Sequence, residues 1–103
     1  MKYTCFICGY KTLENRCDWD ICPICFWMDN LLVTDEKDMN SGGSGNHGVT
    51  VVQAQANFML FGASSERDRD SVRPPLPTDE KDPEWSPFYQ ALQLYEQMKA
   101  ATE

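Results

Sequence analysis

Two short cysteine hooks near the N-terminus constrain the fold of this chain more than any other feature. Each hook is a CxxC turn, and thirteen residues separate the first, Cys5-Phe-Ile-Cys8, from the second, Cys22-Pro-Ile-Cys25. A CxxC turn directs two sulfurs at one point, so two such turns supply four ligands. Four thiolates in tetrahedral geometry are typical of Zn²⁺, with Zn–S distances of about 2.3 Å. The spacing therefore predicts one zinc ion held by Cys5, Cys8, Cys22 and Cys25.

The fifth cysteine, Cys17, lies between the hooks in a stretch that reads as a β-hairpin. Tyr10–Leu13 forms the outgoing strand and Cys17–Ile21 the return strand. Alternation places Cys17, Trp19 and Ile21 on one apolar face, which predicts a buried core thiol and not a spare ligand. The alternative is two disulfides plus an odd thiol. Paired CxxC hooks without a secretory signal fit that alternative poorly.

The start of the chain and its hydropathy predict a cytoplasmic protein. The segment Met1–Cys5 enters the metal site almost at once, which leaves no room for a secretory signal. No apolar run approaches the roughly 18–20 residues that a membrane span requires. Thiol ligands also fit a reducing compartment better than an oxidising one.

The charge is strongly acidic, with 16 acidic against 9 basic residues and a formal net charge of −7. Four thiolates and one Zn²⁺ would bring it to about −9. Binding to nucleic acid is disfavoured, because contact with a phosphate backbone requires Lys and Arg. The charge favours a basic protein partner, or no more than a solvated acidic surface. The candidate partner contacts are Asp18, Asp20, Asp29, Asp35, Glu36 and Asp38.

A glycine-rich loop over residues 41–48 precedes a predicted helix over residues 50–61. The loop lacks the Gly-Lys-Ser/Thr ending of a phosphate-binding loop, and no βαβ unit surrounds it, so we interpret it as a connection. His47 is interpreted as a surface residue and not as a fifth ligand or a general base. Thr50 suits an N-cap and Gly62 a C-terminal stop. Helical spacing predicts packing on the metal-bearing sheet for Val51, Ala54, Phe58 and Phe61.

Residues 79–103 are predicted to be a C-terminal helical extension of a zinc-binding domain over residues 1–78. The prolines of Val72–Pro77 favour an extended segment, after which Asp82-Pro83 or Ser86-Pro87 can begin a helix that runs to about Ala101. We expect the helix to dock on its own domain, with a partner surface or weak self-association of a monomer as the alternative. Its apolar stripe comprises Phe88, Ala91, Leu92, Tyr95 and Met98.

Several ordered blocks between roughly Tyr3 and Pro75 resemble the cysteine-rich CPCC family of small bacterial proteins. Besides the first hook, they comprise Gly9–Leu13, Ile21–Trp27 with Asp29, Gly42-Gly43, Asn46, Ala54–Phe58, Phe61–Ser64 and Val72–Pro74. The resemblance implies a zinc-binding fold, and a role as immunity partner in bacterial toxin systems. Two positions depart from the family. Ile7 replaces the middle cysteine of a Cys-Pro-Cys-Cys hook, which leaves the outer pair as ligands, and Gln55 stands where an arginine is expected.

Together these features predict an α+β fold, with a small zinc-ribbon or rubredoxin-like β-hairpin metal site, a packed helix and a C-terminal helix. The predicted function is that of an immunity protein, a non-enzymatic module that binds and neutralises a nuclease-type toxin with a basic surface. An enzyme is disfavoured, because four cysteines close the zinc shell and no nucleophile elbow or carboxylate pair is recognisable. The alternatives are a zinc-ribbon adaptor without a toxin partner and a rubredoxin-like iron carrier. Phe26 stands where the rubredoxin hook usually has glycine.

Overall fold

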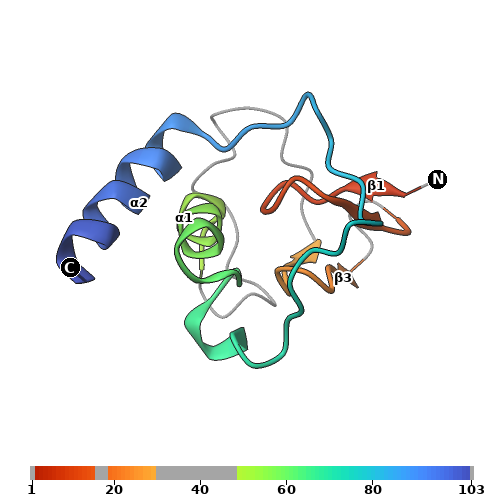
Figure 1. Ribbon diagram of the computed structural model, residues 1–103, viewed down its shortest axis with the longest axis horizontal. Helices are drawn as coiled ribbons and strands as arrows, with labels where there is room; N and C mark the ends of the chain where they lie inside the picture. The colour runs from red at the N-terminus through yellow and green to blue at the C-terminus, as the bar shows by residue number, and fades with distance from the viewer. Residues whose placement is uncertain (1, 16–18, 30–48, 103) are drawn as a thin grey trace.

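The computed structural model describes residues 2–15, 19–29 and 49–102, which form two small β-hairpins and two α-helices. Figure 1 shows helix α1 between the two hairpins on one side and helix α2 on the other. This arrangement confirms the α+β prediction. The elements are β1 (Tyr3–Thr4), β2 (Lys11–Leu13), β3 (Asp20–Ile21), β4 (Met28–Asp29), α1 (Val51–Phe61), the 3₁₀ turn η2 (Glu66–Asp68) and α2 (Tyr89–Thr102).

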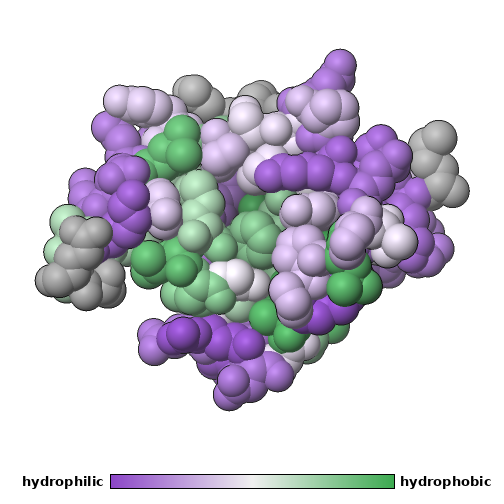
Figure 2. Space-filling view, in the orientation of Figure 1, coloured by the Kyte–Doolittle hydropathy of each residue, from purple (hydrophilic) through white to green (hydrophobic). Residues whose placement is uncertain are grey.

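One face of the molecule is hydrophobic near α1 and hydrophilic around the rim. Figure 2 shows hydrophobic residues gathered around α1 and toward the hairpins, with hydrophilic residues at the edges of the same face. Within the described residues, no helix has both the length and the apolar character needed to cross a membrane.

Each hook forms the turn of a hairpin. β1 pairs antiparallel with β2, and β3 pairs antiparallel with β4, so one hook lies between the strands of each pair. In the first hook the Cys5 N–H donates to the Tyr10 carbonyl at 2.9 Å, and the Gly9 N–H donates to the Cys5 carbonyl at 2.8 Å. These two hydrogen bonds close the turn that carries Cys5 and Cys8.

The second hook repeats the first. The Cys22 N–H donates to the Trp27 carbonyl at 3.0 Å, and the Phe26 N–H donates to the Cys22 carbonyl at 2.7 Å. Equivalent residues of the two hooks are seventeen positions apart in the sequence. Both turns include a left-handed residue, with φ of 82° at Gly9 and 67° at Phe26. Glycine adopts this conformation without steric penalty, whereas a phenylalanine pays on the order of 1 kcal/mol.

The predicted pairing of Tyr10–Leu13 with a return strand over residues 17–21 is wrong, because β2 pairs with β1 and β3 pairs with β4. The predicted inward face of the return strand is wrong as well. Trp19 and Ile21 are 57% and 44% exposed. The physical reason is the second hook: Ile21 directly precedes the fully buried Cys22, so alternation along β3 turns Ile21 outward, and Trp19 just before β3 has a left-handed backbone with φ of 64°. Cys17 lies outside the described residues.

Helix α1 begins and ends where the sequence predicts. The Gln53 N–H donates to the Thr50 hydroxyl at 3.2 Å, while the Gln53 side chain accepts from the Thr50 N–H at 3.0 Å, which completes a capping box. At the other end Gly62, with φ of 84°, donates its N–H to the Phe58 carbonyl. These local hydrogen bonds fix both helix boundaries.

The predicted apolar face of α1 packs toward the hooks over most of its length. Val51 and Ala54 are fully buried among the hook cysteines, and Phe58 packs against the same cluster. Phe61 contacts Arg69 instead: the centre of its ring lies 4.9 Å from the guanidinium carbon of Arg69. Three of the four predicted contacts therefore reach the core around the hooks.

The C-terminal segment runs along the first hairpin before it becomes helical. The Lys11 N–H donates to the Glu80 carbonyl and the Asp82 N–H donates to the Gly9 carbonyl, both at 2.8 Å. Because residues 80–82 are held in this extended pairing, no helix begins at Asp82. α2 begins at Tyr89, later than either proline signal predicts, and the Phe88 carbonyl accepts from the Ala91 and Leu92 N–H groups at its start. The division into residues 1–78 and 79–103 stays a prediction, although hydrogen bonds join the two parts.

Helix α2 packs against α1. Ala91 is fully buried, and Phe88 packs against the core around the hook cysteines. Leu92, a member of the predicted stripe, is instead 41% exposed, whereas Leu94 is partly covered. The face that α2 buries is thus rotated slightly from the predicted stripe.

Trp85 fixes this segment on the first hook. Its indole N–H donates to the Phe6 carbonyl at 2.8 Å. Its ring lies so close to Gly9 that a Cβ built there would collide with the ring carbons. Gly9 is therefore required both by its left-handed backbone and by the approach of Trp85.

We predict that Gly9→Ala destabilises the protein by about 2 kcal/mol more than Gly62→Ala. Both glycines have the same left-handed backbone, so both substitutions lose about 1 kcal/mol through strain. Only the Gly9 variant must also displace a tryptophan ring, which adds an overpacking cost. In the described part of the chain, nothing lies within 4 Å of a Cβ at Gly62, which makes it the matched control. Denaturant unfolding with the metal present measures both, and equal losses would contradict the packing of Trp85 on Gly9.

Candidate metal centre

The structure brings the four predicted ligands together at one point. Their sulfurs all lie within 4.8 Å of one another. The Sγ atoms of Cys5 and Cys25 are 3.5 Å apart, and those of Cys8 and Cys22 are 3.7 Å apart. A tetrahedral shell with the usual metal–sulfur bond places its sulfurs about 3.8 Å apart. The four are free thiols, not two disulfides, and their spacing fits one four-coordinate ion.

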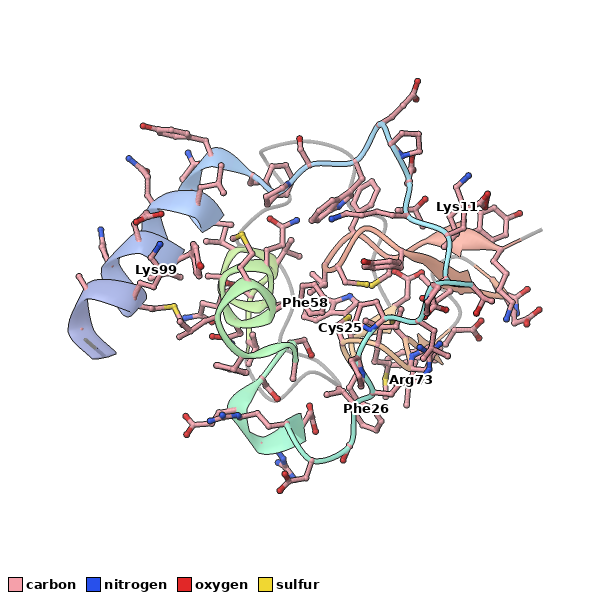
Figure 3. The ribbon with its side chains drawn as sticks, in the orientation of Figure 1. Lys11, Cys25, Phe26, Phe58, Arg73 and Lys99 are labelled. Atoms are coloured by element: carbon pink, nitrogen blue, oxygen red, sulfur yellow. The ribbon has the colours of Figure 1, made fainter. Side chains whose placement is uncertain are left out.

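The centre is closed to solvent. All four cysteines have 0% of their surface exposed. Large apolar side chains of the hairpins surround them, and α1 covers one side; Figure 3 shows Phe58 of α1 near Cys25. Trp27 is 2% exposed, which confirms the prediction that it belongs to the core and is not an exposed anchor. The buried side chains around the sulfurs are Ile7, Leu13, Ile24, Trp27, Val51 and Ala54.

The thiols of this cluster differ in their tendency to ionise. Hydrogen bonds from the thiols of Cys25, Cys5 and Cys8 lower the pKa of Cys22. The hydroxyl of Thr12 adds a further hydrogen bond to Cys22 Sγ, at 3.0 Å.

The pKa of Cys5 is raised well above its usual value, first because its thiol donates to Cys22. Burial is the main cause that raises the pKa of Cys25, followed by its hydrogen bond to Cys22. Without a cation, a thiolate is therefore favoured at Cys22, while Cys5 and Cys25 hold their protons. A divalent ion supplies the positive charge that lets the remaining thiols ionise.

Gln55, which stands where the resemblance predicts an arginine, joins three parts of the fold. It is 2% exposed on the buried face of α1. Its side-chain amide donates to the Phe6 carbonyl at 2.8 Å, and its side-chain oxygen accepts from the Phe88 N–H at 2.9 Å. An arginine has only donors and could not accept from Phe88. One feature of the sequence points to this role of Gln55: it is a polar residue one turn after Val51 on an apolar helix face. A polar residue in such a place indicates a buried hydrogen bond.

The six acidic residues predicted as partner contacts have different settings. Asp20 is partly buried and accepts from the Asn15 N–H at 2.9 Å. Asp29 is only 5% exposed, so its carboxylate does not fit an exposed contact, and this assignment is corrected. The other four, and His47, lie outside the described residues: Asp18, Asp35, Glu36 and Asp38.

Two hairpins that gather four buried thiols, with helices packed over them, define a small α+β protein with a zinc-ribbon-like metal site. The comparison with protein families agrees with this class. The chain belongs to the cysteine-rich CPCC family, whose model matches residues 3–79. No curated protein and no solved structure matches the chain significantly.

We predict that Cys22→Ser abolishes stoichiometric metal binding and that Cys17→Ser retains it. Cys22 supplies one of the four clustered sulfurs, so its loss opens the shell and loosens both hairpins. Metal analysis of the purified variants measures the ion content, and circular dichroism reports the fold. Equal loss of metal from the two variants would show that the ligand assignment is wrong.

We predict that the ion is lost on acidification and that its binding releases at least the protons of Cys5 and Cys25. Both thiols have a raised pKa, so at neutral pH without the ion they are protonated, while the ion binds them as thiolates. Protons therefore compete with the metal increasingly as the pH falls. Titration of metal-free protein with Zn²⁺ in a weakly buffered indicator solution measures the release. Binding without proton release would contradict this account of the cluster.

Proposed function

We propose that this chain is a non-enzymatic zinc protein that binds and neutralises a nuclease-type toxin by covering its basic surface. The observation that carries the proposal is a metal centre with four protein ligands and no exposed sulfur, in a chain with a net charge of −7. A catalytic metal keeps one position open for water or substrate, whereas a closed shell is typical of a structural site. The resemblance to a family with immunity partners also supports a role as a toxin-neutralising protein.

Zinc is the ion that we propose for this centre. A closed shell of four thiolates accepts either zinc or iron, so the donor atoms alone do not choose between them. A structural role favours zinc, because it has no redox chemistry and its binding can be coupled to folding. Protein purified in air should be colourless and contain one zinc per chain. A visible iron–thiolate spectrum that bleaches on reduction would instead support the electron-carrier alternative.

The charge of the chain supports a mechanism of neutralisation by occlusion. Nuclease toxins that hold a phosphate backbone need a basic surface, and an acidic protein is attracted to that surface from a distance. Such steering raises the association rate, and once bound the protein excludes the nucleic acid. The proposed contacts are Asp18, Asp20, Asp35, Glu36 and Asp38.

Co-expression with the product of the neighbouring gene tests the function directly. If that product is the cognate toxin, this chain should restore growth and form a complex that dissociates at high salt, because opposite charges hold the two proteins together. Absence of both growth rescue and a salt-sensitive complex would overturn the proposal.

We predict that changing Asp35, Glu36 and Asp38 together to lysine slows association with the toxin by about tenfold or more at low salt, while the fold is kept. Stopped-flow mixing measures the association rate, and circular dichroism checks the fold. The control carries the same change of charge at three exposed acids elsewhere: Glu14, Asp70 and Glu96. An equal effect of both triple variants would show that net charge matters but that the contact surface lies elsewhere.

A further inference from the structure

A small pocket lies where the first hook, α1 and the C-terminal segment meet. Its volume is about 210 Å³, and it opens to the surface. Phe6 of the hook and Gln55 of α1 line one part of it. The segment after residue 81 lines the other part, with Asp82, Glu84, Trp85, Ser86 and Phe88.

The size of this pocket limits what it can hold. Pockets for cofactors and drug-sized molecules usually enclose roughly 300–1,000 Å³. A pocket of about 210 Å³ falls below that range. It suits one side chain of a partner protein, which is how anchor residues fill pockets at protein interfaces.

Four N–H donors in the pocket wall, those of Trp85, Gln55, Phe88 and Glu84, already form hydrogen bonds within the chain. The indole N–H of Trp85 and the amide of Gln55 both donate to the Phe6 carbonyl at 2.8 Å. The Phe88 N–H donates to Gln55, and the Glu84 N–H donates to Asp82, each at 2.9 Å. An anionic group would therefore find these N–H groups engaged.

The wall also carries two carboxylates, of which Asp82 already accepts from the Thr4 hydroxyl and the Glu84 N–H through its two oxygens. Hydrogen bonds from Thr4 and the Glu84 N–H lower the pKa of Asp82, so its carboxylate stays charged at neutral pH. Glu84 is exposed, and no ion pair to it is present among the described residues. Two negative charges thus stand beside three aromatic rings. One of these rings already attracts a cation within the chain, because Lys81 Nζ lies 5.7 Å from the centre of the Trp85 ring.

We propose that this pocket receives an arginine side chain from a basic protein partner. A guanidinium is planar, so it stacks on aromatic rings and forms paired hydrogen bonds with a carboxylate. A lysine ammonium is a compact point charge that lacks this planar, paired geometry. The inference rests on the proposed function only in that the partner is basic. It adds a contact site formed by Glu84 and Trp85, neither of which is among the acidic contacts proposed above.

The test uses N-acetyl-arginine amide as the probe and the full zinc-loaded chain. NMR titration follows the indole N–H of Trp85 and the side-chain amide of Gln55, which both lie at the pocket. We expect saturable shifts with the arginine probe. The matching citrulline compound has the same shape without the charge, and we expect it to bind at least about fivefold more weakly.

A pair of variants locates the binding. Glu84→Gln should weaken the arginine probe at least about fivefold, while Asp70→Asn, which removes one charge from another exposed acid, should leave it unchanged. Both positions are exposed, so neither change threatens the fold. The proposal would be overturned if the citrulline compound bound as tightly as the arginine probe, or if the two variants had equal effects. Chemical shifts that never saturate would also overturn it.

The outcome is independent of the co-expression test. The proposed function can stand while this pocket fails, and the pocket can bind arginine when the neighbouring product is not a toxin.

Discussion

Four thiols buried at one point are the constraint on which the rest of the structure depends. Their mutual hydrogen bonds and their burial favour one thiolate at Cys22 and hold protons on Cys5 and Cys25, so the cluster cannot ionise fully by itself. A bound dication resolves this conflict, and structural zinc sites contribute on the order of 10 kcal/mol. Strands of two or three residues are marginal without such support. The metal centre and the two hairpins therefore stabilise each other.

The C-terminal segment supplies the second support, and it lies beyond the part of the chain that matches the family. A chain of 103 residues buries only a modest core. Here the segment adds Trp85 over Gly9 and a backbone pairing along β2. Gln55 then ties the first hook to the start of α2 through hydrogen bonds to Phe6 and Phe88. A residue inside the family match thus contacts a segment outside it.

A closed metal centre shifts the search for function to the surface. No sulfur of the centre is exposed, and four protein ligands leave a tetrahedral ion no free position for a substrate. What the hairpins and α1 then position are charges and pockets on the outside, of which the cavity beside Glu84 and Trp85 is one. Both proposals about partners follow from an acidic chain whose metal has no free coordination position.

The sequence by itself determined the ligand set, the two turns and the boundaries of α1. These features depend on residues only a few positions apart: the CxxC spacing, the capping box of Thr50 with Gln53, and the glycine that ends the helix. Tertiary structure decided which strands pair, which way Trp19 and Ile21 face, where α2 begins and what Gln55 does. Those outcomes depend on contacts between residues far apart in the chain, such as Lys11 with Glu80 and Phe6 with Trp85. Local periodicity carries no information about such contacts.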